Sequence, residues 1–166
     1  MSTAKVAGEA ARSFGTVVKF GCLLHCIHDY VIEVTMCIGP SMLPTFNPSG
    51  DIVLLDRFSP RFLNNMKRGD IIVARSPTSA RQTVCKRIRA VEGDHVRTGG
   101  PFREKLVTVP KGHIWLEGDN PNNSTDSRHY GTVPAALVLG RVLLKVWPPE
   151  EAGWVPDRPK ASSQRA

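Results

Sequence analysis

The feature that most limits how this chain can fold is the frequent interruption of its apolar segments after Gly39. Seven segments of three to nine residues are each bounded by Gly, Pro, Asn or Asp, and the 166 residues include 14 Gly and 13 Pro. Segments this short are typical of strands joined by turns. We therefore expect one mostly β, largely antiparallel domain over 39–147, followed by a mobile, Pro-, Ser- and charge-rich tail over 148–166. The candidate strands are Ile52–Leu55, Ile71–Ala74, Val84–Val91, His95–Arg97, Leu106–Val109, His113–Glu117 and Val138–Val146.

The N-terminal part of the chain differs from this domain. Residues 14–38 are mostly apolar, but Lys19, Asp29 and Glu33 interrupt them, whereas a spanning helix needs about 20 apolar residues with few charges. We expect an N-terminal membrane-associated helix over 14–38, either an anchor or an amphipathic helix lying on the surface. Basic residues precede it and acidic residues follow it, so the extension 1–13 should stay inside while the bulk of the chain crosses.

The net charge of +7 comes from one part of the sequence. Residues 57–111 hold 13 Lys and Arg against 4 Asp and Glu, whereas the flanking parts sum to −2 and zero. A nucleic-acid surface would place such charge on a recognition helix or interleave it with stacking aromatics. Only three phenylalanines occur among these residues, and Pro and Gly break the series. We expect a solvated basic face and no nucleic-acid partner.

The four cysteines, Cys22, Cys26, Cys37 and Cys85, form no C-x-x-C or zinc-ligand pattern. A metal site at Cys22 and Cys26 would be poorly spaced, so packing roles are expected. No histidine lies in H-E-x-x-H and no serine in G-x-S-x-G. A Ser-His-Asp triad assembled from distant positions stays open. The sequence implies no metal and no cofactor.

Two residues could together carry chemistry. Ser41 follows Gly39 and Pro40 on a turn whose backbone those residues restrict, which leaves the hydroxyl accessible. Lys86 lies within a candidate strand, where burial costs several kcal/mol unless the amine is neutral or hydrogen-bonded. A neutral lysine can take a proton from a serine hydroxyl. Taken singly, each residue has a simpler interpretation: a Pro-Ser turn and one more basic residue.

The order of four motifs favours the catalytic interpretation. They are G-P-S-M-L-P-T at 39–45, R-G-D-I-I-V at 68–73, K-R-I at 86–88 with E-G-D at 92–94, and G-D-N-P-N-N-S-T-D-S-R-H-Y-G at 118–131. This series resembles the type I signal peptidase family from about Cys37 to Trp147, which implies that family's complex β fold. The short chain and weak anchor resemble its mitochondrial inner membrane branch. The run up to Met42 is nearer to one of the two catalytic subunits of that branch.

Matched residue by residue, the resemblance implies that Ser41 is the nucleophile and Lys86 the general base. Ser124 matches the serine that hydrogen-bonds and orients the lysine, and the backbone N–H of Ser41 would form part of the oxyanion hole. The other matched residues brace or shape the motif loops and have no chemical role: Gly39, Pro40, Gly118, Asp119, Asn120, Asp126 and Arg128.

The implied activity is that of a membrane-anchored serine endopeptidase. It would remove hydrophobic sorting signals from precursor polypeptides, with its catalytic domain facing the mitochondrial intermembrane space. Its partners would be the inner membrane and a second inner membrane protease subunit in a heterodimer. An extended substrate would add a strand to an exposed sheet edge near Ser41.

Some points stay open at this stage. Ala90 stands where bacterial relatives have Gly, and Thr83 or Ser76 could supply a second oxyanion donor. A non-catalytic basic scaffold that stabilises a partner peptidase subunit is an alternative, although the motifs at Ser41 and Lys86 are intact. A self-cleaving Ser-Lys repressor would need a DNA-binding domain and a scissile Ala-Gly, and neither is visible.

Overall fold

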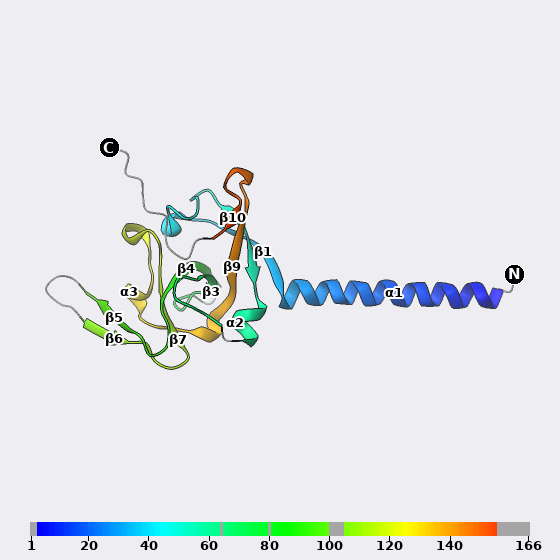
Figure 1. The fold of residues 1–166 in the computed structure, drawn as a ribbon, viewed down its shortest axis with the longest axis horizontal. Coiled ribbons are helices and arrows are strands. Elements are labelled where there is room, and N and C mark those ends of the chain that lie inside the picture. Colours follow the sequence, from blue (N-terminus) through cyan, green and yellow to red (C-terminus); the bar gives the residue numbers. More distant parts are fainter. Residues whose placement is uncertain (1–2, 64, 80, 100–104, 156–166) are drawn as a thin grey trace.

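The fold is organised around one antiparallel sheet, shown in Figure 1. The computed structural model describes residues 3–63, 65–79, 81–99 and 105–155. The strands of the main sheet follow the order β1-β2-β9-β3-β4-β7-β8, and β10 pairs with β9. Their bounds are β1 Ile32–Cys37, β2 Asp51–Asp56, β3 Ile71–Arg75, β4 Thr83–Ala90, β7 His113–Glu117, β8 Val133–Pro134, β9 Val138–Trp147 and β10 Gly153–Trp154. The mostly β fold predicted from the sequence is confirmed.

Strand β3 lies inside the sheet and is buried on both faces. Its side chains alternate between two apolar clusters: Ile71 and Val73 pack into one, and Ile72 and Ala74 into the other. Because successive side chains of a strand point to opposite faces, a strand covered on both sides is apolar throughout. Strand β4 pairs with β3, and Lys86 lies opposite Ile72. Lys86 is thereby held next to the most buried strand.

Smaller elements surround this sheet. A separate hairpin, β5 (His95–Thr98) with β6 (Lys105–Thr108), extends from one end of the domain (Figure 1). The other elements are the helices α2 Phe58–Phe62 and α3 Ser127–Tyr130 and the 3-10 turns Pro40–Met42, Pro121–Asn123, Ala135–Leu137 and Pro149–Glu151. The turns at 40–42 and 121–123 contact each other and so bring two of the sequence motifs together.

Helix α1, Thr3–Tyr30, projects away from the sheet (Figure 1). It leaves large apolar side chains exposed, among them Phe14, Val17 and Phe20. Within the described ranges, no helix combines the length and apolar character required to cross a bilayer.

The structure differs from the predicted boundaries at both ends of the chain. The helix ends at Tyr30 instead of 38, because residues 32–37 alternate between apolar and polar side chains and pair with β2 as β1. Nor is 1–13 a separate extension, since the helix already begins at Thr3. Of the predicted tail, the segment 149–154 forms a turn and β10, whereas 156–166 lies outside the described residues.

Candidate active site

Ser41 lies on the turn that follows β1. Gly39 has φ of 119°, a conformation that costs a side-chain-bearing residue free energy, so glycine is needed where the chain leaves the strand. Pro40 begins the 3-10 turn, and Ser41 follows it with a half-buried side chain. Next to it, Met42 is 3% exposed and packs into the core cluster of β2 and β3. The serine therefore stands on a turn that is fixed from both sides.

Lys86 projects from β4 toward this turn. Its Nζ lies 2.7 Å from Ser41 Oγ, and the residue is only 4% exposed. Burial lowers the pKa of Lys86, because water no longer solvates the ammonium form; Cys85 and Asp126 oppose this shift, and Arg128 adds to it. The structure thus joins the two residues that the sequence singled out, and the lysine is disposed toward its neutral form.

The loop after β7 packs against the backbone of the serine turn. The Asn120 N–H donates to the Ser41 carbonyl oxygen at 3.0 Å, and its side-chain Nδ2 donates to the Pro40 carbonyl at 3.0 Å. A Cβ at Gly118 would lie 2.5 Å from the same Ser41 oxygen and 2.3 Å from Ser124 Oγ. Gly118 and Asn120 therefore position Ser41 directly.

Ser124 has a different partner from the one expected. Its hydroxyl donates to Asp126 Oδ2 at 2.7 Å, and no hydrogen bond joins it to Lys86 in the described part of the chain. An ionised carboxylate is a stronger acceptor for that proton than a lysine amine, and Lys86 Nζ bonds Ser41 Oγ instead. Ser124 is buried beside Gly118, close to the Ser41 backbone.

Asp126 is the most heavily hydrogen-bonded carboxylate of this region and is fully buried. It accepts from Gly118 N at 3.0 Å, from Arg128 Nε and Nη2 at 2.8 and 2.7 Å, and from the Arg128 N–H at the start of α3. Burial alone would raise the pKa of Asp126, but these donors together with Ser124 hold it well below its usual value. The bracing role expected of Asp126 and Arg128 is consistent with this geometry.

A second buried ion pair joins β4 to the loop after β7. Arg87 donates to both oxygens of Asp119, each at 2.8 Å, and to the Gly69 carbonyl at 2.6 Å. Thr45 donates to Asp119 Oδ2 at 2.6 Å and so ties the first motif to the last. Sequence reasoning missed Arg87 and Thr45. It treated Arg87 as one more residue of the solvated basic face expected over 57–111, whereas Arg87 is buried and Arg89 is exposed.

A cavity of about 280 Å³ opens beside Ser41 and Lys86. Its wall includes Cys37, Phe46 and Val84, so much of it is apolar, and Asn123 adds a polar group that the sequence did not indicate. The two residues considered as second oxyanion donors lie differently. Thr83 lines this cavity, whereas Ser76 is buried and its hydroxyl bonds Thr78. Thr83 is the candidate that the geometry retains.

The arrangement agrees with what comparisons with known proteins find. The family described as signal peptidase, peptidase S26, matches residues 10–101 and 98–147. The chain belongs to this family. That membership accounts for the co-location of motifs at 39–45, 86–88 and 118–131 around one cavity.

Relatives within the signal peptidase family refine the comparison. The chain is 44% identical to mitochondrial inner membrane protease subunit 1 of Mus musculus, over 93% of each chain. It is 46% identical to mitochondrial ATP-independent inner membrane protease subunit 1a of Arabidopsis thaliana, over 89% of each. Subunit 2 of the Saccharomyces cerevisiae protease is 38% identical, over 79% of this chain and 77% of that one. The expected resemblance to one catalytic subunit of the inner membrane branch is confirmed, and that subunit is subunit 1.

A solved structure, signal peptidase I of Enterococcus faecalis, is also similar. The sequence identity is 25%, the TM-score is 0.41, and the match covers 46% of this chain and 96% of that chain.

Proposed function

We propose that this signal peptidase family member is a serine endopeptidase with Ser41 as nucleophile and Lys86 as general base. The observation that carries the proposal is the 2.7 Å separation of Lys86 Nζ and Ser41 Oγ, with the lysine buried. Desolvation favours the neutral amine. A neutral amine at that distance can accept the hydroxyl proton as the serine attacks.

The reaction then follows from this pair. Ser41 Oγ bonds to the scissile carbonyl carbon while its proton passes to Lys86 Nζ, and the carbonyl π electrons move onto oxygen. The Ser41 backbone N–H, with Thr83 as a second donor, stabilises that oxyanion. Lys86 next gives the proton to the amine as the C–N bond breaks, which leaves an ester on Ser41. Water attacks the ester carbonyl carbon and gives a proton to Lys86. Lys86 then returns that proton to Ser41 Oγ as the C–Oγ bond breaks and the carboxyl product leaves.

The substrate would bind as an extended strand. Among the described residues β1 pairs only with β2, so its other edge is unpaired, and it leads through Gly39 to Ser41. A peptide that pairs with this edge would bring its backbone to the nucleophile, and one of its side chains would enter the 280 Å³ cavity.

The setting we propose is the mitochondrial inner membrane. The protein would be anchored there through α1, its catalytic domain would face the intermembrane space, and it would remove hydrophobic sorting signals from precursors. Relatives named inner membrane protease subunit 1 and subunit 2 support both this location and a second catalytic subunit as heterodimer partner. The exposed apolar side chains of α1 support the anchoring.

Two substitutions test the catalytic pair. Ser41→Ala and Lys86→Ala, purified with their folds checked by thermal unfolding, should each lower cleavage of a precursor peptide at least about a thousandfold, because the two side chains act as one unit. The exposed residues Ser49→Ala and Lys111→Ala are the matched controls and should keep full activity. Cleavage by either site variant at more than a tenth of the wild-type rate would rule out the dyad.

A further inference from the structure

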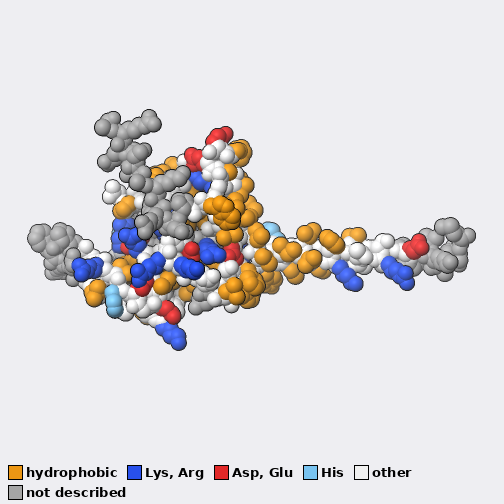
Figure 2. All heavy atoms as spheres, viewed as in Figure 1, with side chains coloured by type: hydrophobic (Ala, Val, Ile, Leu, Met, Phe, Trp, Pro, Cys, Tyr) orange, Lys and Arg blue, Asp and Glu red, His pale blue; other side chains and the backbone are white. Residues whose placement is uncertain are grey.

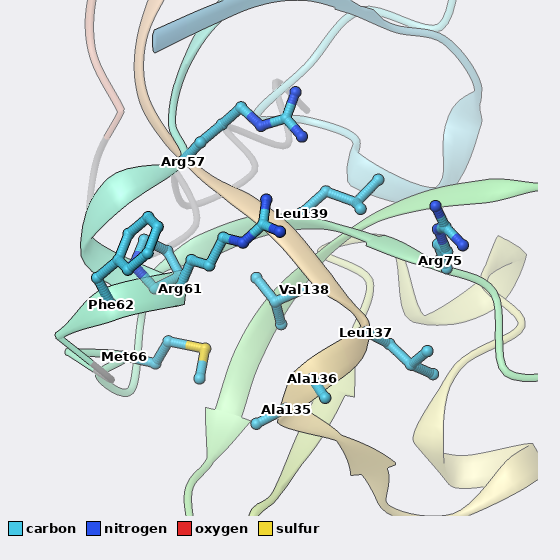
Figure 3. Close-up of a pocket in the computed structure, with 11 residues that line it drawn as sticks. Arg57, Arg61, Phe62, Met66, Arg75, Ala135, Ala136, Leu137, Val138 and Leu139 are labelled. Atoms are coloured by element: carbon cyan, nitrogen blue, oxygen red, sulfur yellow. The ribbon is translucent and has the colours of Figure 1, made fainter. Parts of the chain in front are cut away.

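A larger cavity, of about 570 Å³, lies elsewhere in the domain and shares no residue with the cavity beside Ser41. Its apolar floor is the segment Ala135–Leu139, together with Met66. Three arginines stand around this floor, as Figure 3 shows: Arg57 and Arg61 extend from the α2 region on one side, and Arg75 rises from the end of β3 on the other. The mechanism proposed above uses none of these residues.

The charges of this cavity are poorly compensated. None of the described residues that line it is acidic. Arg57 pairs with Glu33 through Nη1 at 2.6 Å, but its Nε is buried and has no hydrogen-bond partner among the described residues. Arg61 lies 5.8 Å from the Tyr30 ring centre, and neither it nor Arg75 forms an ion pair within the described ranges. A cavity lined by three guanidinium groups, two of which have no ion-pair partner among the described residues, favours an anionic ligand.

The cavity also lies beside the junction of α1 and β1. The Arg57 N–H donates to the Val31 carbonyl at 2.9 Å, which links α2 to that junction. Apolar side chains next to it are exposed, including Phe58, Phe62 and Leu63 of the α2 region. Figure 2 shows hydrophobic side chains gathered where α1 leaves the domain. An exposed aromatic and aliphatic rim beside cations is typical of surfaces that meet a lipid bilayer.

We propose that this three-arginine cavity binds an anionic phospholipid. Arg61 and Arg75 would hold the phosphate, Arg57 would add its positive charge, and an acyl chain would lie on the Ala135–Leu139 floor. Guanidinium groups suit this role because their planar N–H pairs match phosphate oxygens. The inference rests on the proposed membrane location. It gives the catalytic domain a second attachment to the bilayer, separate from α1.

The phosphate in this cavity could belong to a phospholipid headgroup or to a soluble phosphate compound. A free phosphate would use the arginines but gain nothing from the apolar floor and rim. A phospholipid uses both, because Phe62 lines the cavity and, although its ring lies 5.0 Å from that of Phe58, stays exposed. The chemistry therefore favours the lipid.

The test measures lipid binding to the full chain in micelles of a neutral detergent, where α1 is embedded equally in every variant. Phosphatidylglycerol is titrated in, and bound lipid per chain is counted by native mass spectrometry; phosphatidylcholine and inorganic phosphate are titrated in parallel. The test variant is Arg61→Gln/Arg75→Gln. The control is Arg89→Gln/Arg97→Gln, which removes two exposed charges from β4 and β5.

We expect one bound phosphatidylglycerol in the wild type and in the control. The test variant should bind it about 30-fold more weakly, because each basic side chain near an anionic lipid contributes roughly fivefold. Equal weakening in both double variants would show non-specific attraction and overturn the proposal. Phosphatidylcholine binding as tight as that of phosphatidylglycerol would also overturn the proposal. So would tight binding of inorganic phosphate that is lost in the test variant while its lipid binding stays unchanged.

Peptide cleavage in the same micelles separates this inference from the proposed function. The test variant should cleave a soluble peptide at the wild-type rate, which also shows that it is folded. Ser41→Ala should bind phosphatidylglycerol normally and cleave nothing. Loss of cleavage in Ser41→Ala without arginine-dependent lipid binding would leave the peptidase assignment standing and refute the lipid site alone.

Discussion

The sharpest test of the site geometry is the addition of one methyl group at Gly118. The backbone there does not need the left-handed conformation, so space is the only obstacle to a side chain. A Cβ would lie 2.5 Å from the Ser41 carbonyl oxygen and 2.7 Å from Ser124 Cβ. The first of these atoms belongs to the backbone of the nucleophile and the second to the side chain that bonds Asp126, so neither can rotate away.

The size of the effect follows from these distances. Restoring an ordinary contact of 3.4 Å to the Ser41 oxygen requires a displacement of about 0.9 Å. That displacement would stretch the 3.0 Å hydrogen bond from Asn120 and move Oγ away from Lys86. Misplacement of a reacting group by about 1 Å lowers a rate by about a hundredfold. Overpacking a buried site lowers the free energy of unfolding by about 1–3 kcal/mol.

The assay compares Gly118→Ala with two other glycine substitutions. Gly21→Ala adds a methyl group to α1 where nothing lies within 4 Å, and Gly140→Ala adds one on β9, 3.1 Å from the Asp56 carbonyl and away from Ser41. We would measure kcat on a precursor peptide and the denaturant midpoint of each variant. Gly21→Ala should leave both nearly unchanged, and Gly140→Ala should lower stability with little effect on kcat.

Gly118→Ala should lower kcat about a hundredfold in protein that remains folded at the assay temperature. A kcat within threefold of wild type would show that the Ser41 backbone does not depend on this close approach. A similar kcat loss in Gly140→Ala would show that the effect is one of general stability.

Three further predictions concern the charged groups. Because burial holds the pKa of Lys86 below its unfolded value, the unfolded chain binds more protons between the two pKa values, and stability rises with pH there. Lys86→Met should abolish that rise in urea unfolding followed upward to the ordinary lysine pKa of about 10.4. Thr45→Val should cost about 1–1.5 kcal/mol in the same assay by removing a donor to buried Asp119, and an unchanged midpoint would refute this. The acidic limb of the pH–rate profile should move to higher pH in Arg128→Gln and to lower pH in Asp126→Asn; shifts in one direction for both would contradict the reasoning.

Local patterns in the sequence predicted most of the sheet. The segment 71–74 is apolar throughout, and it forms the strand that is buried on both faces. The segment 32–37 was missed, because it continues an apolar stretch whose earlier part has no strand-like alternation. Residues 32–37 do alternate between apolar and polar side chains, but the segment is short, and its pairing with β2, which decides for a strand over helix extension, is not visible in the sequence.

The site was predictable in parts. The turn at Ser41 and the lysine at 86 could be identified from motifs, and the structure brings them within hydrogen-bond distance. The expectation of a solvated basic face over 57–111 was wrong for Arg87, which is buried. The compensating carboxylate, Asp119, lies 32 positions away, so only the fold shows that this arginine is paired. The partner of Ser124 was also missed, although it is close in the sequence: Asp126 is only two residues away and accepts the hydrogen bond from the Ser124 hydroxyl.

The Asp126–Arg128 pair also acts on Lys86 and is more than a brace. An ionised Asp126 is needed to accept from Gly118 and Ser124, which hold the loop against the serine turn. Yet an uncompensated carboxylate near Lys86 would raise the pKa of the amine and keep it protonated. Arg128 contributes the opposite effect, and its two-point contact with Asp126 fixes its charge beside the carboxylate. The arginine therefore allows one buried carboxylate to organise the loop while burial still lowers the pKa of the lysine.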